Sequence, residues 1–142
     1  MRGEPPMNTA VTAVRPVVPF RFRILVVDDE PSIRETAGMI LENEGYDVRT
    51  AADGVDGLRA LSEYLPDLII SDMNMPRMSG SEFLSVVRKR FPQIATIAVS
   101  GEPFEGEMLS GLAADAFLQK GRYTCKDLLQ EIVNLLSSGG AC

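Results

Sequence analysis

The sequence predicts an α/β protein with one parallel β-sheet covered by helices on both faces. Short apolar runs alternate along the chain with longer segments in which apolar residues recur every three or four positions, the pattern of strands alternating with amphipathic helices. The runs are continuously apolar instead of alternating with polar residues, as is typical of parallel strands that are buried on both faces. Right-handed crossovers then bring the carboxyl ends of all strands to one edge of the sheet.

The composition fits one globular domain of this kind. A chain of 142 residues can form one full core but hardly two, and 45% hydrophobic with 24% charged residues is ordinary for a folded protein. The net charge of −6 argues against direct nucleic-acid binding, because phosphate contacts need clustered Lys and Arg. The sequence has no histidine, so histidine-dependent catalysis and histidine phosphorylation within the chain are excluded.

The sequence also predicts a cytoplasmic protein without membrane insertion. No apolar run approaches the roughly 20 residues that span a bilayer, and the N-terminal segment lacks the apolar core of a signal peptide. The two cysteines, Cys125 and Cys142, show no spacing typical of a disulfide framework or a metal site. We therefore expect plain thiols in a reducing compartment.

Three segments are expected along the chain. Residues 1–20 contain four prolines and no sustained period, which predicts a flexible, proline-containing leader. Residues 21–136 carry the regular pattern and form the expected domain. Residues 137–142 are expected to be a flexible tail.

The first half of the domain predicts two strand–helix units. The apolar run 24–27 is the first strand, and Pro31 suits the first turn of the helix that follows. Gly45 ends this helix, and residues 46–51 form the second strand. Asp53 and Gly54 open the second helix, which Pro66 closes. The residues expected to face inward from these helices are Ile33, Ala37, Ile40 and Leu41, then Val55, Leu58, Leu61 and Leu65.

The second half predicts three further strands and helices. The apolar run 68–70 is a central strand, and a helix from about Gly80 follows, with Phe83, Leu84 and Val87 facing inward. Strands at 94–99 and 116–119 flank a helix at about 102–114, whose interior glycines each cost about 1 kcal/mol relative to alanine. The last helix is expected at about 124–136 and has a wide apolar face.

Polar residues whose side chains could bind a cation or take part in a reaction follow four of the five strands. In chain order they are Asp28 and Asp29, then Asp72 with Asn74, then Ser100, and finally Lys120. Carboxylates that converge at neighbouring strand ends repel each other unless a cation compensates. Oxygen ligands suit a hard divalent ion, and Mg²⁺ fits because it needs few protein carboxylates and keeps several waters.

Such a site fits phosphoryl transfer. A bound cation would let a phosphoryl group approach the acidic residues, while Lys120 and the Ser100 hydroxyl would supply a positive charge and a donor for its oxygens. Asp72 would be the nucleophile, because a carboxylate can accept a phosphoryl group as an acyl phosphate. A nucleotide site is disfavoured, since the turn after the first strand is acidic and no Gly-x-Gly-x-x-Gly or Walker-type loop is present.

Each of these residues also has an ordinary structural role when taken singly. Asp28 or Asp29 could cap the first helix, Ser100 could be a turn residue, Lys120 a surface charge and Phe117 a core residue. Their coincidence at one edge of the sheet, in an order consistent with one pocket, favours a shared site.

Four blocks of sequence strongly resemble the receiver domains of two-component response regulators. They are residues 23–31 (RILVVDDEP), 66–80 (PDLIISDMNMPRMSG), 97–101 (IAVSG) and 114–120 (ADAFLQK). The resemblance implies a flavodoxin-like, doubly wound five-stranded parallel sheet of order 2-1-3-4-5. It also implies phosphorylation of Asp72 by a histidine kinase or phosphotransfer protein.

The resemblance also assigns roles to single residues. Asp28, Asp29, Asp72 and the Asn74 backbone carbonyl would hold Mg²⁺. Ser100 and Lys120 would contact the phosphoryl group, and Ser100 and Phe117 would act as the switch. Two departures stand out: Gly121 follows the lysine where receivers usually have proline, and the stretch between Ser100 and Lys120 is short and glycine-rich.

The sequence therefore predicts a stand-alone receiver that is activated by phosphorylation and signals by protein contact. Slow self-phosphorylation and self-dephosphorylation are expected. The expected output surface is formed by the fourth helix, fifth strand and fifth helix. A homodimer is one of the expected partner states. The alternative is a constitutive interaction module that kept the fold but not the switch. A metal-dependent phosphohydrolase is less favoured, because no substrate-specificity segment is evident.

Overall fold

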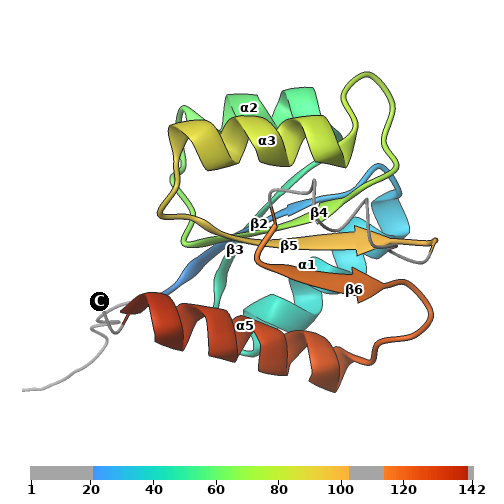
Figure 1. Cartoon of the computed structure of the whole chain (residues 1–142). Helices are drawn as coiled ribbons and strands as arrows, with labels where there is room; N and C mark the ends of the chain where they lie inside the picture. Colours follow the sequence, from blue (N-terminus) through green and yellow to red (C-terminus); the bar gives the residue numbers. More distant parts are fainter. Residues whose placement is uncertain (1–20, 103–113, 141–142) are drawn as a thin grey trace, which may run out of the picture.

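The continuous apolar runs form one five-stranded parallel sheet. The computed structural model describes residues 21–102 and 114–140, and Figure 1 shows the sheet at their centre. Its strands, in chain order, are β2 (Arg23–Val27), β3 (Asp47–Ala51), β4 (Leu68–Asp72), β5 (Ala95–Ser100) and β6 (Ala116–Gln119). Their order across the sheet is β3-β2-β4-β5-β6 with every pair parallel. This order confirms the predicted flavodoxin-like topology, 2-1-3-4-5.

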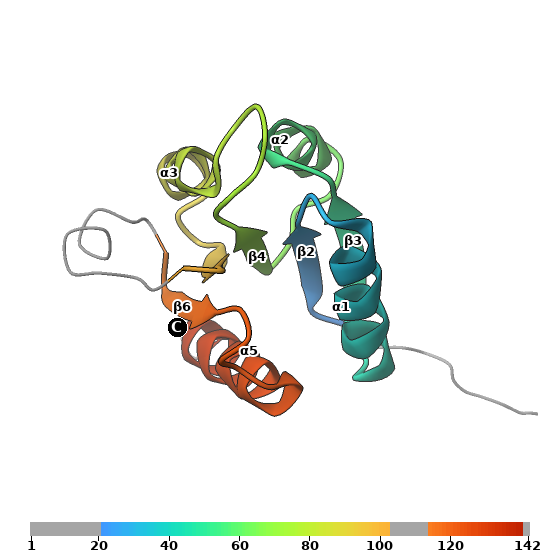
Figure 2. The same cartoon turned by 90° about the vertical axis from the view of Figure 1, so that its right-hand side faces the viewer.

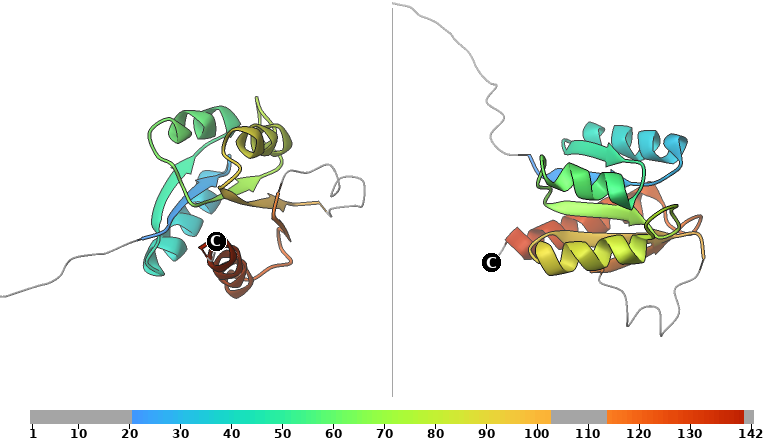
Figure 3. Two further views of the ribbon diagram at one scale, coloured as in Figure 1. Left: turned by 60° about the vertical axis from the view of Figure 1, so that its left-hand side comes forward. Right: turned by 90° about the horizontal axis from the view of Figure 1, so that it is seen from above.

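Four described helices cover both faces of the sheet. Helices α2 (Gly54–Leu61) and α3 (Gly80–Arg90) lie on one face, and α1 (Pro31–Asn43) and α5 (Cys125–Gly140) lie on the other. The end-on view in Figure 2 separates these layers, and Figure 3 shows α2 and α3 side by side above the strands. None of the described helices is long and apolar enough to cross a membrane.

Alternate residues of each strand pack into two separate hydrophobic cores, one on each face of the sheet. Leu25 and Val27 of β2 belong to the core beneath α2 and α3, whereas Ile24 and Val26 belong to the core beneath α1 and α5. The other strands alternate in the same way, because successive side chains of a strand point to opposite faces. The predicted inward residues of α3, namely Phe83, Leu84 and Val87, are fully buried.

Several element boundaries differ from the predicted ones by one residue, and three differ in ways that change the interpretation. Helix α2 ends at Leu61, so Leu65 lies beyond it and is exposed instead of facing the core. Helix α5 continues past Leu136 to Gly140, so residues 137–140, predicted as part of a flexible tail, belong to this helix. Strand β4 continues through Asp72, which makes the predicted nucleophile part of the sheet. The predicted leader (residues 1–20) and residues 103–113 of the predicted helix at 102–114 lie outside the described residues.

Local capping signals begin the helices that flank the functional edge. Ser79 and Glu82 form a reciprocal capping box at α3, and the Asp53 side chain accepts a hydrogen bond from the Asp56 backbone N–H at α2. Helix α1 starts with Pro31 at its first turn and has no side-chain cap from Glu30. The acidic turn before α1 is therefore left available for other contacts.

Candidate functional site

The predicted polar residues meet at the carboxyl edge of the sheet, defined here as the C-terminal ends of β2, β4, β5 and β6. Register brings them there: Val27 pairs with Ser71, Asp72 with Val99, and Ser100 with Gln119. Each residue that ends a strand, or directly follows one, therefore lies beside its counterpart on the next strand. The sequence order of these residues becomes a spatial order across the edge.

Asp72 is a buried carboxylate at the centre of this edge. Its side chain is only 3% exposed, and its Oδ1 accepts a hydrogen bond of 3.2 Å from the Asn74 backbone N–H. Burial raises the pKa of Asp72 above its usual value, the Asn74 N–H and Lys120 oppose this rise, and the Asp28 charge adds to it. A buried carboxylate with a perturbed pKa is the kind of group found at reactive sites.

Three carboxylates gather around this point. Asp28, Asp29 and Asp72 each offer one oxygen, and these oxygens lie within 4.8 Å of one another. Asp28 and Asp72 are buried whereas Asp29 is exposed, and the Asp28 Oδ1 accepts a 2.9 Å hydrogen bond from the Glu30 N–H. An all-oxygen, negatively charged donor set that is open on one side fits a hard divalent cation which retains water ligands.

Lys120 supplies the positive charge of the site. Its Nζ lies 3.4 Å from the Asp72 Oδ2, 3.5 Å from the Asp28 Oδ2 and 3.8 Å from the Glu30 Oε1. Burial alone would lower the pKa of Lys120, but the Asp28 and Asp72 carboxylates outweigh it and raise the pKa. The lysine is thus a protonated cation between two buried acids.

Gly121, which follows Lys120, departs from the receiver pattern, yet Lys120 still lies at the carboxyl edge. Gly121 has φ 80°, a left-handed conformation that glycine adopts at little cost. The Lys120 backbone N–H donates to the Ser100 carbonyl at 2.8 Å. This bond continues the β5–β6 pairing and holds Lys120 next to the end of β5.

Ser100 and Phe117 come from the two strands on one side of Asp72. Ser100 is buried, and its Oγ accepts a 3.1 Å hydrogen bond from the Glu102 N–H. Phe117 is half-buried and packs against the core beneath α2 and α3. It pairs with Ala98, two residues before Ser100 along β5.

Residues 24–132 match the family described as "Response regulator receiver domain". The match runs from β2 into α5 and includes the whole carboxyl edge. The chain belongs to this receiver family. The receiver identity predicted from the four sequence blocks is therefore confirmed, together with its place in two-component signalling. Receivers of this family take up a phosphoryl group on an aspartate.

Relatives of known structure share the receiver fold. A CheY-like receiver domain protein from Methanospirillum hungatei is 32% identical and aligns with TM-score 0.79 over 86% of this chain and 98% of its own. The response regulator TrrA from Thermotoga maritima, solved in complex with Mg²⁺-BeF, is 37% identical with TM-score 0.71 over 81% of this chain and 98% of its own.

The curated relatives are longer proteins. Response regulator Rre1 from Synechocystis sp. is 35% identical in an alignment of 102 residues that covers 68% of this chain and 44% of the relative. The chain spans about half or less of the length of the first such relatives. The shared part is the receiver.

The receiver site contains contacts that the sequence pattern did not identify. Glu30 is the third acid near Lys120, and a pocket of about 300 Å³ opens beside Asp28, Asp72 and Lys120 and is also lined by Tyr123. Glu30 had a sequence signal, as it directly follows two site acids. Tyr123 had none, because only the packing of α5 brings it there.

Proposed function

We propose that Asp72 accepts a phosphoryl group from a phosphohistidine of a histidine kinase or phosphotransfer protein. The observation that carries this proposal is the buried Asp72 carboxylate, held between the Lys120 ammonium and an acidic cluster at the carboxyl edge. In the transfer, an Asp72 carboxylate oxygen bonds to phosphorus as the phosphorus–nitrogen bond breaks, and the imidazole leaves. Because this sequence contains no histidine, the donor histidine lies outside it.

The residues of the site would have different roles in the transfer: metal binding, charge stabilisation and hydrogen-bond donation. Asp28, Asp29, Asp72 and the Asn74 backbone carbonyl would hold Mg²⁺, which when bound supplies charge neutralisation for the phosphoryl oxygens. Lys120, already near the Asp72 carboxylate, gives a fixed positive charge for the same oxygens. The buried Ser100 Oγ accepts from the Glu102 N–H, and its own hydroxyl hydrogen would be donated to a phosphoryl oxygen.

We further infer that phosphorylation is passed on through protein contact. Ser100 moving toward the phosphoryl group would leave space behind it, and Phe117 on the adjacent strand would repack into that space. The surface that we infer for output is formed by the edge strand β6, which carries Phe117, and by α5, whose Val133 is 48% exposed. This surface would contact a downstream protein or a second copy of the chain.

A phosphorylation assay tests the proposal. Incubation with acetyl phosphate and Mg²⁺ should yield one slower band on a Phos-tag gel, labile to hydroxylamine as acyl phosphates are. Asp72→Asn should abolish this band. The matched control is Asp67→Asn, which changes an aspartate just before the same strand, at the opposite edge of the sheet, and should keep it.

The assay also addresses the competing view. A wild-type protein that gives no band with acetyl phosphate or with a phosphorylated kinase would be a constitutive interaction module. A band that persists in Asp72→Asn would place the phosphoryl group on another residue. Either result would overturn the proposal.

A further inference from the structure

Arg77 has an unusual backbone conformation in the loop that follows the strand of Asp72. Its φ is 67°, and it is the only non-glycine residue with positive φ in the part of the chain that the structure describes. The Met78 N–H donates to the Pro76 carbonyl at 2.7 Å around it, which makes a tight turn. Residues with large side chains rarely occupy this region of φ, and non-glycine residues that do so cluster at functional sites.

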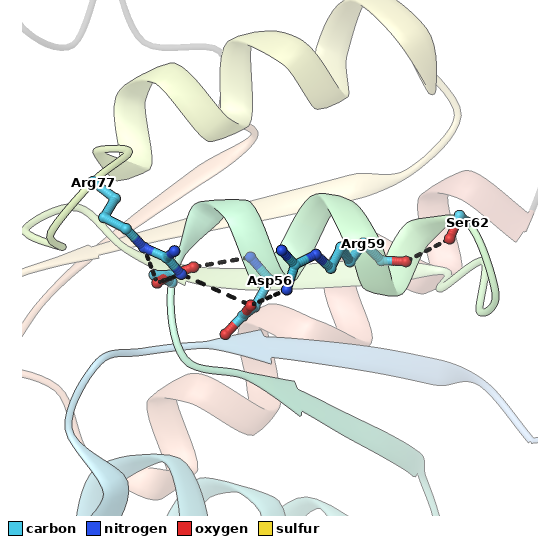
Figure 4. Close-up of polar contacts among 5 residues, drawn as sticks. Asp56, Arg59, Ser62 and Arg77 are labelled. Carbon is cyan, nitrogen blue, oxygen red and sulfur yellow. Dashed lines mark hydrogen bonds and ion pairs between the residues drawn. The ribbon is translucent and has the colours of Figure 1, made fainter.

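The Arg77 side chain reaches the N-terminal end of α2, as Figure 4 shows. Its Nε donates to the Asp53 Oδ2 at 2.9 Å, and its Nη2 contacts the same oxygen. The Asp53 side chain is only 8% exposed, and its other oxygen caps α2 through the Asp56 N–H. That backbone hydrogen bond and the Arg77 guanidinium both lower the pKa of Asp53, so the pair is ionised and charge-assisted.

The same loop is attached to the carboxyl edge at both of its ends. The Met73 N–H donates to the Val99 carbonyl at 2.9 Å, and the Gly80 N–H donates to the Met73 carbonyl at 3.1 Å. At the tip, the Met78 side chain lies over Gly54 so closely that a Cβ there would lie 2.9 Å from its Cγ and Sδ. Between these anchors lies Asn74, which is exposed and donates its N–H to Asp72.

We propose that the Arg77–Asp53 ion pair holds the loop of residues 73–79 against α2 and thereby positions the Asn74 backbone carbonyl for a divalent cation. This inference rests on the proposed function, in which that carbonyl is a metal ligand. Arg77 is then a positioning residue, since it acts on the metal site through the loop backbone. The ion pair keeps the exposed loop ordered before a cation binds.

Loss of the Arg77–Asp53 ion pair should change the Mg²⁺ affinity in the direction opposite to the one that simple electrostatics predicts. If the ion pair is lost, the loop must be ordered when the cation binds, and the entropic cost weakens binding. By Coulomb's law alone, removing the Arg77 positive charge would instead strengthen the binding of a divalent cation. The direction of the change therefore separates positioning from charge.

The first experiment measures Mg²⁺ affinity by NMR chemical-shift titration of the amides around Asp72. Arg77→Gly is the test variant, because glycine accepts a φ of 67° without strain. It should bind Mg²⁺ about tenfold more weakly than wild type, the loss typical of removing a residue that orients a metal ligand. Arg77→Lys, which restores the charge with a single donor group, should recover part of the affinity.

Two further variants test the partner and the specificity of the effect. Asp53→Asn keeps a helix cap but removes the ion pair, and it should weaken Mg²⁺ binding as Arg77→Gly does. Their combination should weaken it no further, because both remove one interaction. The matched control is Arg59→Gln on α2. Arg59 pairs with Asp56 of its own helix at 3.4 Å, and the Arg77 Nη2 lies 3.9 Å from the same Asp56 oxygen. This control should bind Mg²⁺ as wild type does.

The second experiment separates binding from chemistry. In phosphorylation by acetyl phosphate, Arg77→Gly should raise the half-saturating Mg²⁺ concentration, while the rate at saturating Mg²⁺ stays within about twofold of wild type. Unchanged or stronger Mg²⁺ binding in Arg77→Gly would overturn the inference, as would full additivity with Asp53→Asn. In those cases wild type still binds Mg²⁺ and becomes phosphorylated. If wild type does neither, the proposed function fails and the inference falls with it.

Discussion

At the scale of single residues, the site places like charges close together in a buried position. Asp28 and Asp72 both lie within reach of Lys120, and the single ammonium group does not neutralise two carboxylates. Burial then leaves Asp72 with a raised pKa. The protein thus loses some stability at the residue proposed to accept the phosphoryl group, as functional sites commonly do.

This cost predicts that Asp72→Asn stabilises the metal-free protein at neutral pH. Because the pKa of Asp72 is raised on folding, its protonated form favours the folded state below the ordinary aspartate pKa. That advantage is lost as the pH rises through the raised value. Asn stays neutral throughout, so the variant should melt at a higher temperature than wild type at pH 7 in EDTA. The two melting curves should converge as the pH falls to about 3, and a constant difference at all pH values would contradict this origin.

A second residue-scale prediction concerns the lifetime of the phosphorylated state. The amide of the exposed Asn74 can both donate to and accept from a water molecule in line with the Asp72–phosphorus bond. A side chain added at Gly101 would meet no heavy atom within 4 Å, so the approach there is open. Asn74→Leu and Gly101→Val should each slow dephosphorylation severalfold while phosphorylation persists, as measured by loss of the Phos-tag band after donor removal. Wild-type decay in both variants would show that water access does not set the lifetime.

At the scale of elements, close backbone packing joins α3 to the end of β4. A Cβ on Gly80 would lie 2.2 Å from the Asp72 carbonyl oxygen and 2.6 Å from the Met73 Cα. Neither atom can move without moving the strand end that carries Asp72. The glycine that begins α3 is therefore required by the backbone next to the site, and not by its own φ.

Gly80→Ala should accordingly destabilise the domain by about 3 kcal/mol, within the range for strong steric overlap in a well-packed site. Urea denaturation measures this loss, and the same variant should be phosphorylated more slowly. The control is Gly38→Ala in α1, where the added Cβ would meet Thr50 at an ordinary 3.9 Å. That change should stabilise the domain by roughly 0.5–1 kcal/mol, because alanine is the better helix former. Equal effects of the two changes would contradict the steric argument.

At the scale of the whole molecule, the parallel sheet couples cation binding to folding. Asp28 and Asp29 follow β2 while Asp72 ends β4, so their oxygens are neighbours only when the two strands pair. An unfolded chain has no such cluster. A ligand that binds only the folded state stabilises it according to the ligand concentration.

Mg²⁺ should therefore raise the melting temperature of wild type, with about 2.7 kcal/mol of stabilisation at a hundred times the dissociation constant. EDTA should reverse the effect. Asp29→Asn, which removes the exposed member of the cluster, should need higher Mg²⁺ for the same rise. The control is NaCl at equal ionic strength, since an equal rise in NaCl would indicate charge screening and not binding.

The sequence by itself determined the fold and most of the site. Continuous apolar runs specify buried parallel strands, and parallel strands bring their carboxyl ends to one edge. Asp28, Asp72, Ser100 and Lys120 could therefore be placed together without coordinates, because each directly follows or ends a strand. The four blocks of receiver-like sequence pointed to the same topology that the sheet shows.

Only the tertiary structure decided the contacts between segments that share no period. Arg77 and Asp53 lie 24 positions apart in a loop and a helix cap, and nothing in either local pattern pairs them. The exposure of Leu65 and the approach of Tyr123 to the pocket are likewise set by the tertiary structure. Periodicity specifies which face of an element is buried, whereas loop contacts depend on side-chain geometry in three dimensions, which no local pattern encodes.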